Sequence, residues 1–310
     1  MHGRWFNSAV VVLWLATTGW LVTQKVLPSL LIGEPPSASS IVDSQLDKPP
    51  VGWRISCNGR RLGWAISETQ SQPAGLAEIH GRVHFDSLPL KEMTKGWLGA
   101  FSQFVAPFDG LRMDARSTLT IDPLGHLVAF DSAVRLDPLD EIVRIRGTVE
   151  GRQLQLTVST GGASLNSEMF LPSDALLSDA LSPQTQLPGL RAGQSWTVPV
   201  YSPLRPAKNP LEIMQAAVEG LEPVSWNGAA ESCWLVVYRG DPGSGSSGND
   251  KPRGRLWVRR DGSVLKQQVL LFDSVITFDR LADSEAAKLL TRAGPQWWTV
   301  DNDFRSRRHD

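Results

Sequence analysis

The sequence predicts a mainly β fold: a long, curved antiparallel meander of half-barrel form, packed on one amphipathic helix and preceded by one transmembrane helix. Three observations predict it. Apolar and polar residues alternate in segment after segment from Val51 onward. Very short connections join many of these segments, which favours antiparallel neighbours because parallel strands need a long crossover. A single uncharged apolar run, Ala9–Val22, lies near the start of the chain.

The apolar run follows a short lead that contains Arg4, which is the layout of a signal sequence. No small-x-small cleavage site follows it directly, and apolar residues resume after Lys25. A spanning helix needs about 20 residues, so we expect an uncleaved signal-anchor over Phe6–Val26. The alternatives are a signal peptide cleaved late, near Ser37–Ser39, and a buried core helix.

The anchor determines the expected domain organisation. Residues 1–32 are the N-terminal membrane anchor, 33–50 a linker rich in Pro and Ser, 51–280 an extracytoplasmic β domain, and 281–310 a short helix and a charged tail. A sub-boundary within the β domain is expected near 182–194, where prolines interrupt the pattern. Arg4 predicts a single-pass protein with its N-terminus inside and its β domain in the periplasm or otherwise outside the cytoplasm.

The first β run begins with two segments that flank Asn58-Gly59, a dipeptide suited to a tight hairpin turn. Alternation is clearest in the fourth segment, where Arg112, Asp114 and Arg116 oppose apolar residues. The predicted strands are Val51–Cys57, Leu62–Glu68, Leu76–Phe85, Leu111–Asp122, His126–Leu136, Glu141–Glu150, Arg152–Ser159 and Ala163–Leu171.

The second β run contains another hairpin signal, Asp261-Gly262. Its predicted strands are Ser195–Tyr201, Leu211–Val224, Glu231–Arg239, Arg255–Arg260 and Ser263–Phe272. The amphipathic helix is expected at Leu90–Val105, between Pro89 and Pro107, with short helices at Ser173–Leu181 and Asp283–Leu290. An amphipathic helix and a one-sided sheet bury their apolar faces on each other.

Composition limits the function classes. The chain has 310 residues, with Lys+Arg 31 against Asp+Glu 32 and a net charge of −1. Nucleic-acid binding, which would favour a clustered basic surplus, is therefore not expected. Outside the cytoplasm Cys57 and Cys233 could form a disulfide. The alternative is that they are two separate buried thiols.

We expect no catalytic, cofactor or metal site. His80 and His84 share one strand face about 13 Å apart, at about 3.3 Å per residue, which is too far for one metal ion. We interpret both as residues of the solvent face. Neither cysteine lies at a helix N-terminus that would activate it, and no glycine loop has the spacing that cradles phosphate.

An apolar surface is the remaining candidate for binding. The inner face of the sheet and the amphipathic helix could enclose an apolar ligand, or they could pack together as a filled core. The residues of this candidate ligand face are Trp97, Phe101, Met113, Leu119, Ile121, Val143 and Ile145.

Three segments carry a resemblance to a known arrangement: Asn58–Trp64 (NGRRLGW), Gly189–Leu204 (GLRAGQSWTVPVYSPL) and Arg255–Gln268 (RLWVRRDGSVLKQQ). Together they resemble an uncharacterised bacterial extracytoplasmic β domain found ahead of transglutaminase-like modules, which is similar in pattern to the lipoprotein-carrier half-barrels of the Lol type. The resemblance spans roughly Val51–Arg280. It implies a curved sheet, an envelope location and the handling of an apolar ligand, and it transfers no catalytic residue. No transglutaminase-like module follows Arg280.

The leading hypothesis is a membrane-tethered, non-enzymatic envelope domain that binds a partner protein or a wall component. A half-barrel that handles lipid or lipoprotein is the alternative, and a hydrolase is the third class. The expected partners are thus the membrane, through the N-terminal helix, and an envelope protein or apolar ligand.

Overall fold

A single large sheet makes up most of the structure, a computed structural model that describes residues 3–21, 36–87, 111–137, 141–160, 162–170, 176–177, 182–201, 211–240, 252–271 and 274–299. In these ranges the helices are α1 Gly3–Leu21, α3 Ala38–Gln45 and α6 Asp283–Ala293, with a 3-10 turn at Pro73–Gly75. The strands are β1 Val51–Cys57, β2 Arg60–Ser71, β3 Ala77–Phe85, β4 Arg112–Ile121, β5 Leu127–Asp137, β6 Glu141–Glu150, β7 Gln153–Thr160, β8 Ala163–Phe170, β9 Leu176–Leu177, β10 Ser195–Tyr201, β11 Leu211–Trp226, β12 Ala229–Gly240, β13 Gly254–Val258, β14 Val264–Leu271 and β15 Ser274–Arg280.

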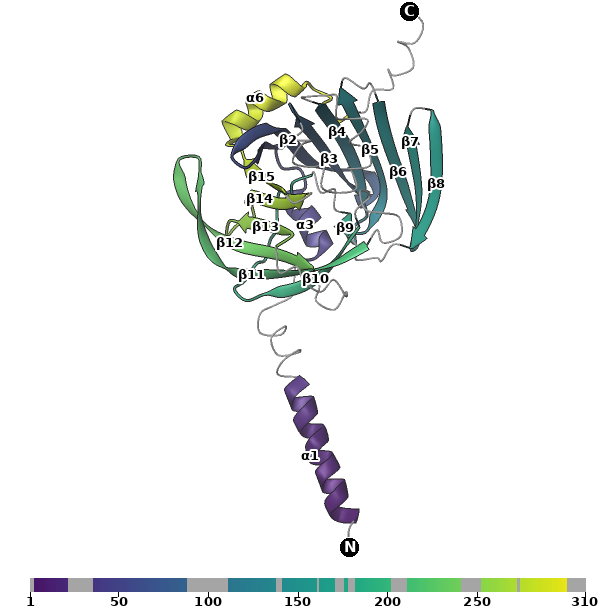
Figure 1. Cartoon of the computed structure of the whole chain (residues 1–310), viewed down its shortest axis with the longest axis vertical. Helices are drawn as coiled ribbons and strands as arrows, with labels where there is room; N and C mark the ends of the chain where they lie inside the picture. Colours follow the sequence, from purple (N-terminus) through teal and green to yellow (C-terminus); the bar gives the residue numbers. More distant parts are fainter. Residues whose placement is uncertain are drawn as a thin grey trace, which may run out of the picture.

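The sheet is an antiparallel meander, as predicted. Its strand order runs from β8 down to β1, then from β15 down to β9, so the two β runs are joined where β1 pairs with β15. Neighbours are antiparallel except for β9, which pairs in parallel with β10. The two edges, β8 and β9, are not hydrogen-bonded to each other, and the sheet curves strongly around a hollow (Figure 1).

Asn-Gly turns create two of the hairpins. Asn58 and Gly59 have φ values of 50° and 78°, and Asn227 and Gly228 have φ values of 50° and 79°. Two successive positive φ angles match the twist of the flanking strands, and few residue pairs other than Asn-Gly adopt them readily. The first hairpin, between β1 and β2, was predicted, and the second joins β11 to β12.

The main core lies on the concave face of the sheet, the face that carries Trp53, Ile55 and Phe278. These three side chains are fully buried, with 0% exposure. They belong to a cluster that includes Val83 from the first β run and Val236 from the second. Because both runs contribute to one cluster, curvature lets the sheet pack against itself.

The helix α3 lies in the hollow and occupies part of the expected linker (Figure 1). Its N-cap is Ser37, whose hydroxyl accepts a hydrogen bond from the Ser40 backbone N–H. Val42 is buried among β3, β4 and β7 residues, and the Thr69 hydroxyl donates to Gln45 Oε1 over 2.9 Å. The interpretation of residues 33–50 as a linker is therefore wrong for the part from Ala38 onward, because this segment packs on the sheet.

Two other elements differ from prediction. The helix expected at Ser173–Leu181 is wrong where it is described, since Leu176–Leu177 forms β9 beside β10. The strand β15 was not predicted, although it joins the two β runs. The amphipathic helix expected at Leu90–Val105 lies outside the described residues. Among the described helices, α3 lies on the concave face.

The C-terminal elements cover part of the convex face, near β1, β3 and β4. The helix α6, which confirms the prediction of a helix from Asp283, lies against β1 at Gly52. A Cβ atom on Gly52 would lie 3.1 Å from the Ala286 Cβ, so the small residue permits close approach. Arg54 and Glu285 form an exposed ion pair at 3.5 Å. A further apolar cluster, with Trp257 and Cys233, covers the convex face of the second run.

The described part of the N-terminal helix α1, Gly3–Leu21, covers only part of the predicted anchor, because residues 22–35 lie outside the described residues. Among the helices in the described ranges, none combines the length and apolar character needed to cross a membrane. The expected transmembrane helix over Phe6–Val26 is therefore not supported.

Candidate functional site

The predicted apolar ligand face is part of the packed concave surface. Met113 belongs to the main cluster, whereas Ile121, Leu119 and Ile145 belong to or pack against the cluster around Val42 of α3. Val143, also on β6, is half-buried. Trp97 and Phe101 lie outside the described residues. The structure thus brings the described members together on one face, and α3 packs on the same face.

The two cysteines lie on opposite faces of the sheet, and no disulfide joins their sulfurs. Cys57 belongs to the concave cluster with Trp53, whereas Cys233 lies in the convex cluster with Trp257. This arrangement matches the alternative of two separate buried thiols. Burial raises the pKa of Cys233 to about 11, so its thiol stays protonated at neutral pH.

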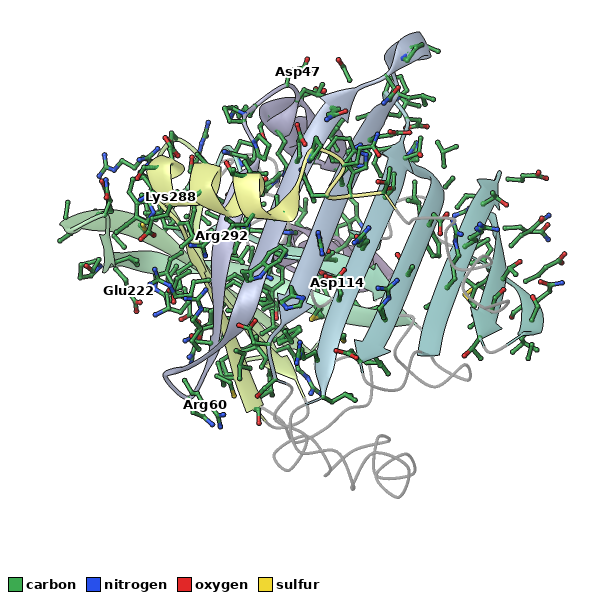
Figure 2. The ribbon with its side chains drawn as sticks, turned by 90° about the horizontal axis from the view of Figure 1, so that it is seen from above. Asp47, Arg60, Asp114, Glu222, Lys288 and Arg292 are labelled. Carbon is green, nitrogen blue, oxygen red and sulfur yellow. The ribbon has the colours of Figure 1, made fainter. Side chains whose placement is uncertain are left out.

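A polar cluster on the convex face is the candidate site that the sequence did not reveal. It consists of Trp64 on β2, Arg82 and His84 on β3, and Asp114 and Arg116 on β4; we call it the Asp114 cluster. Figure 2 shows Asp114 on the face over which α6 also lies. The antiparallel register pairs His84 with Asp114 and Arg82 with Arg116. Paired residues point to the same side, so register alone gathers these side chains.

Asp114 holds the cluster together. Arg82 donates to its Oδ2 atom from Nε at 3.0 Å and from Nη2 at 2.7 Å, and Arg116 donates to Oδ1 from Nε at 3.2 Å. The Nδ1 atom of His84 lies 3.2 Å from Oδ2. Burial alone would raise the pKa of Asp114, but the hydrogen bonds from His84 and Arg82 and the charges of both arginines outweigh it and lower the pKa to about 2. Asp114 is therefore ionised at all physiological pH values.

Aromatic contacts of Trp64 hold His84 and Arg82 in place within the cluster. The Trp64 ring stacks on His84 with centroids 5.3 Å apart, and the Arg82 guanidinium lies 5.2 Å from the Trp64 centroid. Cation–π contacts of this kind restrict both partners. The cluster thus gathers two arginines around Asp114, and the Asp86 carboxylate lies next to it, 3.5 Å from His84 Nε2.

The geometry around His84 is unlike a nucleophile and its general base. Its Nδ1 faces Asp114, and its Nε2 lies 3.5 Å from the Asp86 carboxylate. Both ring nitrogens thus face carboxylates, whereas a general base needs one nitrogen beside the hydroxyl or thiol it activates. In the described ranges no group of three or more His, Cys, Asp or Glu side chains could hold a metal ion.

His80 is not a solvent-face residue, which corrects that interpretation. It is only 3% exposed because the C-terminal segment folds back over it: Trp298 stacks on its ring with centroids 5.2 Å apart. The Thr118 hydroxyl lies 3.2 Å from Nδ1, and Glu78 lies 3.5 Å from Nε2. The hydroxyl, imidazole and carboxylate follow one another in the order of a catalytic relay. Trp298 covers them, so a substrate could not reach them. We interpret it as a clamp that fixes the C-terminal segment, which Arg116 also binds through the Thr299 carbonyl.

Acidification is expected to weaken this clamp. Burial lowers the pKa of His80 from its ordinary 6.5, and this outweighs the raising effects of Glu78 and Glu68. The folded state therefore favours the neutral imidazole of His80. Above pH 6.5 the ring is neutral in both the folded and the unfolded chain, and the protein keeps its full stability. Below pH 6.5 the unfolded chain binds the proton more readily, so the free energy of unfolding falls, by at most about 1.4 kcal/mol per pH unit.

Urea unfolding at pH 7.5 and pH 5.5 measures this effect. The His80→Gln variant keeps hydrogen-bonding atoms and removes the titration, so its stability should change less between the two pH values. An identical pH dependence in wild type and His80→Gln would contradict the assignment. The matched control is His126→Gln, which removes a half-exposed imidazole elsewhere.

Comparisons with known proteins give a distant structural similarity. No protein-family model and no curated protein matches the chain. Among solved structures the chain is similar to a β-barrel-like protein of a domain of unknown function, DUF1849, from Brucella abortus. The identity is 11%, the TM-score is 0.43, and the match covers 75% of this chain and 95% of that one. That protein's description states no activity.

Proposed function

We propose that this protein is a membrane-tethered, non-enzymatic domain of the bacterial envelope that binds an acidic partner, a protein or a wall component, through its convex face. Its helix α1 attaches it to the lipid layer, and the sheet domain lies outside the cytoplasm. The observation that carries the proposal is the exposed apolar surface of α1.

The apolar side chains of α1 are exposed around the helix. Val12, Leu13, Trp14 and Trp20 are 63–67% exposed. A helix that is apolar all round needs an apolar environment, because water would have to solvate every face. The Thr17 hydroxyl donates to the Leu13 carbonyl over 2.9 Å, so the helix itself satisfies this polar group. Both features suit insertion among lipid chains.

The Asp114 cluster supports the binding part of the proposal. Its two arginines place positive charge on the convex face, and Trp64 adds an aromatic surface of the kind common at binding sites. The contacts of His84 with two carboxylates support a non-enzymatic role. The alternative of a lipid-handling half-barrel is not adopted, because α3 packs on the concave face that a lipid would need.

Vesicle flotation of the full chain tests the proposal. Wild-type protein is expected to float with vesicles of phosphatidylethanolamine and phosphatidylglycerol. Leu13→Glu should lower the partition coefficient at least about tenfold, because a charged side chain in the hydrocarbon costs roughly 2–3 kcal/mol. The matched control is Leu165→Glu on β8, which replaces a leucine that is 70% exposed on the sheet.

Flotation of Leu165→Glu should equal that of wild type. If Leu13→Glu also floats like wild type, α1 is not the attachment segment and the proposal fails. Failure of the wild-type protein to float would overturn it as well.

A further inference from the structure

An open groove of about 480 Å³ lies between the end of α6 and β2, beside the segment that follows the helix. We call it the Trp298 groove. Its walls include Leu290 and Gly294 at the end of α6, Glu68 on β2, and Pro295, Trp297 and Trp298 after the helix. Glu68 is the one charged side chain among the described residues that line it. A mainly apolar lining with a single polar group, in this range of volume, is typical of small-molecule sites.

Local structure brings the two tryptophans to this groove. Gly294 ends α6 with a φ of 86°, and Pro295 cannot continue the helix. Trp297 and Trp298 follow, and their rings meet edge to face at an angle of 84°, with centroids 5.4 Å apart. Trp297 is buried, whereas Trp298 is half-buried and stacks on His80. These contacts fix the aromatic wall of the groove before any ligand arrives.

Glu68 brings a carboxylate without a cation to the groove. It is half-buried, and it lies on the same face of the sheet as His80, its cross-strand partner. No described Lys, Arg or His nitrogen lies within 4.0 Å of its carboxylate, and its side chain makes no hydrogen bond with a described residue. Lys48 and Arg280 line the adjoining cavity, where Asp283 offsets the charge of Arg280. The negative charge of Glu68 is therefore available to a ligand.

The end of α6 adds to the negative potential of the groove. The last carbonyl groups of a helix carry a partial negative charge, and Leu290, Thr291 and Gly294 at this end line the groove. Arg292, in the same turn, is exposed and does not line the groove. A carboxylate, a helix C-terminus and an aromatic wall all favour a cation over an anion.

We propose that the Trp298 groove binds an organic ammonium ion with a short apolar body. The ammonium group lies beside the Glu68 carboxylate and the Trp298 ring, and the apolar body packs on Leu290 and Pro295. Tryptophan is the side chain that attracts such cations most strongly. Two sources offer this chemistry, the lysine side chain of a polypeptide and the choline or ethanolamine headgroup of a lipid. The site shares no residue with the Asp114 cluster and is independent of α1.

Isothermal titration of the full chain in a neutral detergent at pH 7.5 tests the proposal. The probes are choline, the amide of acetylated lysine with its side chain free, and the neutral tert-butyl analogue of choline, which has the same shape without the charge. At least one of the two cations is expected to bind about fivefold or more tightly than the neutral analogue. Tighter binding of the lysine derivative would assign the ligand to a polypeptide, and tighter binding of choline would assign it to a lipid headgroup. No measurable binding of either cation, or equal affinity for the neutral analogue, would overturn the proposal.

Glu68→Gln assigns the binding to this carboxylate. The variant keeps the shape of the side chain and removes its charge, so the affinity for the cation should fall at least about fivefold, whereas that for the neutral analogue should stay the same. The matched control, Glu231→Gln on β12, removes a half-buried carboxylate that does not line the groove and should bind like wild type. Undiminished affinity of the Glu68→Gln variant for the cation would overturn the assignment.

Discussion

Gly63→Ala is expected to lower the free energy of unfolding by at least about 3 kcal/mol, the upper range for single substitutions. A Cβ atom at this position would lie 1.9 Å from the His84 carbonyl oxygen and 2.9 Å from its carbonyl carbon. Both atoms are backbone, so no side-chain rotation relieves the overlap. Gly63 pairs with Phe85 across β2 and β3, and either this pairing or the strand geometry must change.

Gly63→Ala is expected to disturb the candidate site as well. His84 belongs to the Asp114 cluster, and a shift of its backbone moves its ring away from Asp114 and Trp64. Urea unfolding measures the stability, and the matched control is Gly254→Ala on β13. There the nearest atom to an added Cβ is 3.4 Å away, an ordinary contact. Equal stability of Gly63→Ala and wild type would mean that β2 and β3 approach less closely than described.

Local patterns predicted the meander because they carry the information for single strands and tight turns. The alternation at Leu76–Phe85 and the Asn58-Gly59 turn each depend on neighbouring residues, and both elements are present as β3 and the first hairpin. The strand β15 was missed although Ile276 and Phe278 alternate with polar Thr277 and Asp279. Its role as the junction of the two β runs depends on long-range pairing with β1.

Tertiary contacts explain the other differences from prediction. Residues around Ile41 and Val42 have few apolar neighbours in the sequence, and α3 is stabilised by burial in the hollow and by bonds to β2. Leu176–Leu177 becomes a strand because β10 offers an edge. His80 is buried by Trp298, which is distant in the sequence. No local pattern could predict these three outcomes.

The sequence did not predict the Asp114 cluster, because the cluster too depends on contacts between distant segments. Alternation correctly placed Arg82 and His84 on one polar face and Asp114 and Arg116 on another. Which residues face each other depends on the register of β3 on β4, and residues 88–110, outside the described ranges, lie between these segments. A short hairpin would have specified that register through its turn.

Asp114→Ala is expected to lower the free energy of unfolding by about 2–3 kcal/mol at pH 7. Removing this carboxylate leaves Arg82, Arg116 and His84 without their central acceptor, while at least three-quarters of each side chain is buried. Losing one member of a buried charged group costs more than losing an exposed pair, because the remaining charges stay desolvated. Asp137→Asn, in a half-exposed pair with Arg112 at 3.9 Å, is the matched control and should change stability little.

The pH dependence of stability distinguishes charge from packing in this cluster. The pKa of Asp114 falls from 3.8 to about 2 on folding, so its stabilising effect is complete above pH 3.8 and is lost as pH falls through about 2. The shift corresponds to about 2 kcal/mol at neutral pH. Asp114→Asn preserves the shape of the side chain and removes the charge.

Stability of the Asp114→Asn variant measured by urea unfolding from pH 4 to pH 2 should therefore decrease less than that of wild type. If Asp114→Asn and Asp114→Ala are equally destabilised at pH 7, the charged carboxylate is the part that matters, since both variants lack it. If Asn restores most of the stability, the remaining amide oxygen and the packing hold the cluster, and the arginine charge would be open to a partner. Binding of an acidic partner would then strengthen in Asp114→Asn, because the same two arginines would have lost their internal anion.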